Sequence, residues 1–349
     1  KRIMAYSTIP KSTSYFETEL YNGSGSAQSI TGLNFQPDWV WIKRRSSTRG
    51  HTLFDVVRTA TYGIYSESND VQSVGATSLT AFTSDGFTLG TDDRVSGSGH
   101  TYASWNWKAG TAVSGATTGS GTAKTYTGSV NTTAGFSIIN YIGNSGSGHE
   151  IPHRLGVTPK MIIVKCLNQA QGWTVYHQSL GSGTPQNYWI RLDETGGQTS
   201  ASDIWNNTAP NATNFTVGDS DNVNGGLNYI AYCFAEKTGY SKFGSYTGNA
   251  STNGPFVYTG FKPAFVIVKS TSSGRDWILG DNKRLGYNNG NKYLVPNSTS
   301  AEAAFDIDYF SNGFKLKTSG NPNVSGETYI FMAFGQPIVS TNGDIATAR

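Results

Sequence analysis

One spacing recurs three times along this sequence, and it constrains the fold more than any other feature. A proline is followed six positions later by a lysine, and the residues between them are mainly apolar. The three pairs are Pro37 and Lys43, Pro159 and Lys165, and Pro263 and Lys269. Proline at the first position of a strand withholds no donor that the sheet needs, and it fixes the angle of chain entry. Each stretch therefore predicts a loop followed by a buried strand that ends at the lysine.

Two more positions keep a constant distance from each lysine. A ring comes eight residues after the lysine, and a polar side chain comes twelve residues after it. The rings are His51, Trp173 and Trp277, and the polar residues are Asp55, His177 and Asp281. A second strand that pairs with the first accounts for this register.

The beginning and the end of each unit repeat as well. A tyrosine precedes each proline loop, and Asp-Gly or Asn-Gly turns typical of hairpins precede a late apolar run in the first and third copies. Each copy closes with a tyrosine and an aromatic residue five positions later: Tyr102 and Trp107, Tyr229 and Phe234, Tyr329 and Phe334. This spacing predicts either a bulge or two rings that fill different layers.

Composition favours short strands over helices. Only 14% of the residues are charged, 42 of 349 are glycine, and the strand-forming residues Tyr, Phe, Trp, Val, Ile and Thr are abundant. We predict an all-β protein of three tandem antiparallel β-sandwich or jelly-roll-like repeats of about 100 residues each. The expected parts are an arm at 1–13, repeats at 14–108, 134–237 and 238–336, a flexible Gly/Ser/Thr-rich linker at 109–133, and a tail at 337–349.

The charge and the motif content argue against several classes of function. The net charge of +3 is too small for a nucleic-acid-binding protein, and no stretch of 18 apolar residues predicts membrane insertion. Cys166 and Cys233 are expected to be buried free thiols. Neither a nucleophile elbow, nor a zinc-binding spacing, nor a phosphate-binding glycine loop is present. We therefore expect no enzyme activity and no cofactor.

Two kinds of acidic site remain as alternatives. A glycosidase needs two carboxylates, which Asp55, Asp193, Glu194 or Asp281 could supply, although acids at turns and strand ends are common. Asp219 and Asp221 lie in an acidic turn whose oxygens could hold Ca²⁺, but their spacing departs from the established calcium loop.

Aromatic residues carry the clearest signal of ligand binding. Sugar faces stack on aromatic rings while neighbouring polar side chains bond the hydroxyls. Most of the eight tryptophans lie in strand-like runs and are expected in the core. Trp189 and Trp205 lie in a long polar segment, so we predict that they are exposed and, with Arg191, contribute to a ligand-binding surface.

Several motifs resemble a family of tripartite bacteriophage proteins, mostly marine, that are often labelled tail-fibre or virion structural proteins. The motifs are SYFET at 14–18, VWIK at 40–43, YIAYCFAE at 229–236, GYSKFGSYTG at 239–248 and ATAR at 346–349. The resemblance covers nearly the whole chain and implies a virion location and a non-catalytic role. It assigns no catalytic or ligand-binding residues.

Together these observations predict a non-enzymatic virion protein, most simply a tail-fibre or appendage component that binds host-surface glycan. We expect its partners to be further copies of itself, with trimers as one arrangement, and other virion proteins. The alternatives are a capsid or tail decoration protein, a polysaccharide-degrading tailspike, and a lectin-like secreted protein.

Overall fold

Short strands and tight turns dominate the backbone, as expected for a chain so rich in β-branched and aromatic residues. The computed structural model describes residues 7–9, 11–272, 274–284, 288 and 290–337. Over those residues the helices are α1 (Asp93–Ser96), α2 (Ser202–Trp205) and three 3₁₀ turns at Ser12–Ser14, Leu180–Gly183 and Pro185–Asn187. The predicted all-β class is confirmed. Within the same ranges, no helix has the length and apolar character needed to cross a bilayer.

Three larger sheets share a run of four strands in the same order, all paired antiparallel. Unit one (12–108) contains β1 (Phe16–Asn22), β9 (Thr101–Trp107), β3 (Trp39–Arg44) and β4 (His51–Asp55) in this order. Unit two (109–236) contains β13 (Phe136–Ile142), β20 (Asn228–Phe234), β15 (Met161–Cys166) and β16 (Thr174–His177), extended by β17 (Tyr188–Arg191) and β18 (Thr199–Ser200). Unit three (237–337) contains β21 (Ser241–Thr247), β29 (Thr328–Pro337), β23 (Phe261–Ser270) and β24 (Ile278–Asp281), extended by β25 (Lys292–Leu294) and β26 (Ala303–Ala304).

Each unit also has a smaller outer sheet of three strands. In unit one it contains β2 (Gln28–Ile30), β8 (Gly86–Leu89) and β7 (Leu79–Thr83), and β5 (Tyr62–Gly63) pairs separately with β6 (Ser73–Val74). In unit two it contains β11 (Thr118–Gly119), β14 (His149–Pro152) and β19 (Asn214–Val217). In unit three it contains β22 (Phe256–Tyr258), β28 (Gly313–Leu316) and β27 (Ile307–Phe310). Hairpin turns join β7 to β8 and β27 to β28, at the Asp-Gly and Asn-Gly positions.

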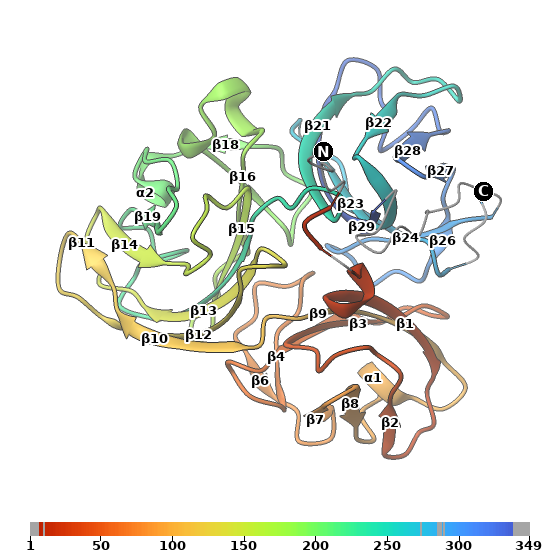
Figure 1. Cartoon of the computed structure of the whole chain (residues 1–349), viewed down its shortest axis with the longest axis horizontal. Coiled ribbons are helices and arrows are strands. Elements are labelled where there is room, and N and C mark those ends of the chain that lie inside the picture. The colour runs from red at the N-terminus through yellow and green to blue at the C-terminus, as the bar shows by residue number, and fades with distance from the viewer. Residues whose placement is uncertain (1–6, 10, 273, 285–287, 289, 338–349) are drawn as a thin grey trace, which may run out of the picture.

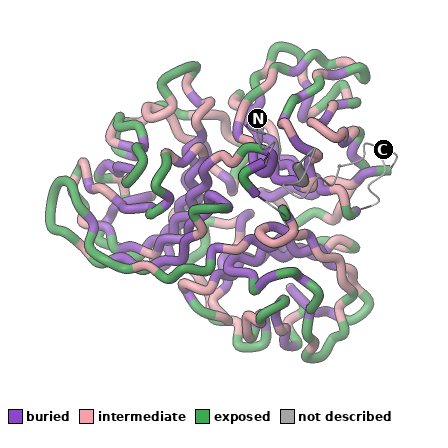
Figure 2. The backbone as a smooth tube through the Cα atoms, in the orientation of Figure 1, coloured by how far each residue is buried: buried purple, intermediate pink, exposed green. Residues whose placement is uncertain are grey.

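The three units are arranged around a common centre (Figure 1). One continuous aromatic core fills this centre and contains residues from all three inner sheets. Trp39 of unit one stacks on Tyr232 of unit two with ring centroids 4.5 Å apart. Phe334 of unit three lies 5.5 Å from Phe16 of unit one and 5.9 Å from Phe234 of unit two. Figure 2 shows buried backbone gathered in this central region and exposed backbone at the rim.

The tyrosine and the aromatic residue that close each repeat were predicted either to flank a bulge or to fill different layers. In units one and two they fill different layers. Tyr102 lies in a core between the inner and outer sheets of unit one, whereas Trp107 lies in the central core. Tyr229 and Phe234 divide in the same way in unit two. Strand β9 keeps a regular register with β1, so no bulge is required there.

The predicted linker at 109–133 is wrong. This segment forms β10 (Thr111–Ala116) and β12 (Thr125–Asn131), which extend the inner sheet of unit two in the order β10-β12-β13. Tyr126 and Val130 are buried in the outer core of unit two. The small residues of this segment bury little apolar surface. Tyr126, Val130 and the pairing of β12 with β13 stabilise it instead.

The predicted arm and tail fall mostly outside the described residues, which exclude 1–6, 10 and 338–349. Within the predicted arm, Ile9 is fully buried in the central core and is therefore not part of a free extension. Pro37 and Pro159 lie in the loops before β3 and β15 as expected, whereas Pro263 lies within β23 next to a register shift.

Candidate functional site

The three repeated lysines are buried at the junctions between units. Their side chains are fully inaccessible to solvent. Lys43 Nζ donates to Thr299 O of unit three at 3.3 Å, Lys165 Nζ to Asn69 O of unit one at 3.1 Å, and Lys269 Nζ to Thr195 O of unit two at 2.8 Å. Burial lowers the pKa of each ammonium group to about 8. Each lysine is the penultimate residue of its strand, so the strand extends one residue beyond the end that the sequence predicted. Each lysine also binds the preceding unit of a cycle.

The rings eight residues further on make the same cyclic contacts. Trp173 Nε1 donates to Tyr65 O of unit one, and Trp277 Nε1 donates to Arg191 O of unit two, both at 2.7 Å. His51 replaces tryptophan in unit one, and its Nε2 lies 3.0 Å from Val295 O of unit three. A carbonyl can only accept, so Nε2 of His51 carries the proton.

The polar residues twelve positions after the lysines bind the last strand of the next unit. Asp55 accepts a hydrogen bond of 2.8 Å from the Tyr232 hydroxyl, and Asp281 accepts one of 3.0 Å from Trp105 Nε1. His177 instead lies 3.1 Å from the backbone oxygen of Phe331, and its Nε2 donates. Equivalent positions thus fix all three units to one another.

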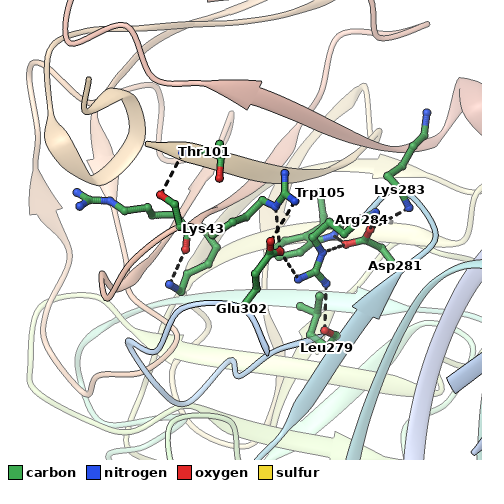
Figure 3. A network of polar contacts seen from close by, with 11 residues as sticks. Lys43, Thr101, Trp105, Leu279, Asp281, Lys283, Arg284 and Glu302 are labelled. Atoms are coloured by element: carbon green, nitrogen blue, oxygen red, sulfur yellow. Dashed lines mark hydrogen bonds and ion pairs between the residues drawn. The ribbon is translucent and has the colours of Figure 1, made fainter. Parts of the chain in front are cut away.

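A charged network closes the junction between units one and three (Figure 3). Arg284 Nε lies 2.7 Å from Asp281 Oδ2, and Arg45 Nε lies 2.9 Å from Glu302 Oε2. Arg284 Nη1 connects the two pairs at 3.6 Å from Glu302. Asp281 is fully buried and already accepts from Trp105, so this carboxylate holds the units together and is not positioned for hydrolysis.

The carboxylates considered for glycoside hydrolysis do not form a site together. Asp55 is fully buried in an ion pair with Arg58 at 2.6 Å, in the same arrangement as Asp281. Asp193 accepts the backbone N–H of Trp173 at 2.9 Å. Glu194 is exposed and lies 3.5 Å from Arg191. The buried acids lack access to a polysaccharide.

The predicted surface at Trp189, Trp205 and Arg191 is only partly present. Trp205 is 1% exposed and packs into the outer core of unit two, so its predicted exposure is wrong. Helix α2 directs this ring inward, where it contacts Phe215 and Tyr176. Trp189 is half-buried, and the guanidinium of Arg191 covers its ring at 5.1 Å from the centroid.

Asp219 and Asp221 are exposed. In the described ranges, no three His, Cys, Asp or Glu side chains converge in a way that could hold a metal ion. Cys166 and Cys233 are buried free thiols as expected.

An exposed aromatic face on the outer sheet of unit three was missed at the sequence level. Phe256 is 47% exposed and Tyr258 is 62% exposed, while Val257 between them is buried. The two rings thus project from the same face of β22, about 7 Å apart along the strand. Phe310 of β27 packs edge-on against Phe256 with centroids 5.8 Å apart.

Polar side chains border these rings. Lys315 is the cross-strand neighbour of Phe256, and its ammonium group donates to Asn253 Oδ1. Asp308 is the neighbour of Lys315 on the other side and forms an ion pair of 3.3 Å with Lys317. We call Phe256, Tyr258, Phe310, Lys315 and Asp308 the aromatic face.

The equivalent strands of the other units lack these rings. In all three units a buried aliphatic residue lies opposite a buried phenylalanine: Ile30 and Phe87, Ile151 and Phe215, Val257 and Phe314. The residues on either side are Ser29 and Thr31 in unit one, Glu150 and Pro152 in unit two, and Phe256 and Tyr258 in unit three. Aligning the units by this pair would have identified the aromatic face from the sequence.

The sheets define the chain as an all-β protein of packed antiparallel sheets. It belongs to the family described as domain of unknown function DUF7483, whose sequence model matches residues 11–337. Neither the curated proteins nor the solved structures contain a match to this chain. The family description assigns no activity.

Proposed function

We propose that this chain is a non-enzymatic bacteriophage virion component, in a tail fibre or another appendage, that binds host-surface glycan through the aromatic face of unit three. The observation that carries this proposal is the exposure of Phe256 and Tyr258 side by side on one strand. The resemblance to phage tail-fibre proteins supports the virion location.

The chemistry of the aromatic face fits a sugar. The faces of Phe256 and Tyr258 can stack on the C–H surfaces of pyranose rings, because aromatic rings carry negative charge on their faces. Lys315, Asp308 and the Tyr258 hydroxyl surround the rings and can exchange hydrogen bonds with sugar hydroxyls. A flat face of this kind fits an extended polysaccharide lying across β22, β28 and β27.

The rigidity of the support also favours binding. Val257 and Phe314 anchor the outer sheet in the core beneath it. A Cβ on Gly313 would lie 2.2 Å from Val257 O and 2.8 Å from the Phe256 ring, so only glycine at this position leaves room for both the neighbouring strand and the ring. A preorganised face loses little conformational entropy when a ligand binds.

The test is a binding screen of the purified chain against envelope polysaccharides from bacterial hosts. The double variant Phe256→Ala, Tyr258→Ala should bind at least about tenfold more weakly than the wild type, because two stacking contacts are lost. Ser29→Ala, Thr31→Ala changes the same positions in unit one and serves as the matched control, with unchanged binding expected.

Equal binding by the double variant and the wild type would show that the aromatic face does not bind the glycan. If no polysaccharide binds, the glycan proposal is wrong. Release of reducing ends from a bound polysaccharide would contradict the non-enzymatic assignment and favour a polysaccharide-degrading spike.

A further inference from the structure

The hairpin of β10 and β12 exposes a sheet edge that differs from the corresponding edges of the other units. The inner sheets of units one and three end at β1 and β21, and that of unit two ends at β10. Strand β1 carries Glu17 and Glu19, and β21 carries Lys242. Charged residues on an edge strand discourage pairing with another chain. Strand β10 reads TAVSGA and contains neither a charge nor a proline.

The backbone of β10 is regular and open to solvent. Five of its six residues are exposed, and its register with β12 runs without a bulge from Thr111 to Ala116. The next residue, Thr117, donates its N–H to Lys124 O at 2.7 Å, which continues the same register. Because hydrogen-bonded and non-hydrogen-bonded pairs alternate, the N–H groups of Ala112, Ser114 and Ala116 point away from β12.

These outward groups have no backbone partner in the described part of the chain. The inner face of the hairpin is open as well, since a groove of about 610 Å³ separates it from Gln36, Val56 and Val57 of unit one. Figure 1 shows β10 at the outer edge of unit two.

We propose that β10 is a self-association edge, along which the β10 strand of a second copy adds antiparallel. A twofold axis makes two equivalent strands antiparallel, and the β-pairings that define the sheets of this chain are antiparallel. Small neutral side chains meet like side chains across such an axis without repulsion. The result is one sheet that continues through both copies.

This contact is independent of the aromatic face, which lies on the outer sheet of unit three. A single pair of six-residue strands buries little surface, so the dimer is expected to be weak and to depend on concentration. On a particle that carries several copies, the same contact would be strengthened by high local concentration.

Sedimentation equilibrium of the full chain, up to about 1 mM, tests the proposal. The wild type should shift towards twice the monomer mass of 37.4 kDa as concentration rises. Ser114→Pro removes an outward N–H without breaking a bond to β12, and Ser114→Lys places a positive charge on the edge of each copy. Both variants should remain monomeric, while Ser114→Ala keeps the N–H and should associate like the wild type.

Ser114→Pro could lower the stability of the fold. Ser114→Lys provides the control, because an unchanged thermal unfolding temperature would show that its loss of association is not a loss of fold. A wild type that stays monomeric over the whole range overturns the proposal. Association of Ser114→Lys to the same extent as the wild type overturns it as well.

Discussion

At the residue scale, the junctions show how different side chains fill one structural role. Trp173 and Trp277 reach a carbonyl of the neighbouring unit through their indole N–H. His51 reaches its carbonyl through Nε2, and its Nδ1 accepts from Trp41 Nε1 at 2.8 Å. Both ring nitrogens of His51 are therefore committed to the neutral form, and burial keeps its pKa well below the ordinary value.

His177 offers the clearest test of these buried neutral imidazoles. Its Nε2–H donates to Phe331 O, and its Nδ1 accepts the N–H of Ser179 at 3.2 Å. Burial lowers its pKa to about 4, against 6.5 for an exposed histidine. Between these values the unfolded chain binds a proton that the folded chain does not, so stability falls as the pH is lowered through this window.

His177→Gln keeps a side-chain N–H donor but does not titrate. From pH 7 to pH 5, the wild type should lose on the order of 2 kcal/mol more unfolding free energy than this variant, measured by urea denaturation. Burial raises the pKa of Asp38 to about 6 and that of Glu67 to about 7, so these two groups increase stability as the pH falls. The wild type and His177→Gln share both groups, so this contribution cancels in the comparison. Equal losses in the two proteins would show that His177 does not titrate as described.

The sequence located these residues but not their contacts. The constant spacing from Lys43, Lys165 and Lys269 reports the register of two strands within a unit, and that register is observed. Each lysine also binds a carbonyl in a loop of another unit, and spacing within one unit cannot predict that contact. The exposure of Trp205 was mispredicted for a related reason, since a polar neighbourhood in sequence does not show which way a short helix directs its ring.

At the scale of single elements, the segment 109–133 shows the limit of composition as a guide. Its small and polar residues are typical of linkers. Strand β12 is nevertheless held between β10 and β13, with Tyr126 and Val130 in the core. A few buried side chains and a complete ladder outweigh the composition of the remaining residues.

Amide hydrogen exchange distinguishes this strand from a linker. The central amides of β12, residues 127–130, should exchange at least about a hundredfold more slowly than in an unstructured peptide, as the amides of β13 should. The exposed turn at 121–123 provides an internal reference and should exchange fast. Fast exchange throughout 109–133 would support the linker and would also remove the edge from which we infer self-association.

At the scale of the whole molecule, the three units share one core. The strand patterns predicted an all-β chain with three similar thirds, but they did not predict that the inner sheets face one another. A strand that is buried on both faces is apolar throughout. This pattern is the same whether the second face packs against a sheet of the same unit or against a neighbouring unit, so the sequence cannot distinguish the two. The rings of Trp39, Phe234 and Phe334 belong to that second layer, and each contacts another unit.

A shared core makes the units dependent on one another, and it leaves the outer sheets free to carry different surfaces. Unit three uses this freedom for Phe256 and Tyr258, whereas unit one has Ser29 and Thr31 at the same positions. If the units folded independently, the contacts of Lys43, Lys165 and Lys269 between units would contribute nothing to their stability.

Scanning calorimetry of the full chain measures this dependence directly. We predict a single transition whose calorimetric enthalpy equals its van't Hoff enthalpy, because breaking the central core unfolds all three units together. Two or three separate transitions, or a calorimetric enthalpy well above the van't Hoff value, would show that the units unfold independently. Either result would contradict the claim that the three units share one core.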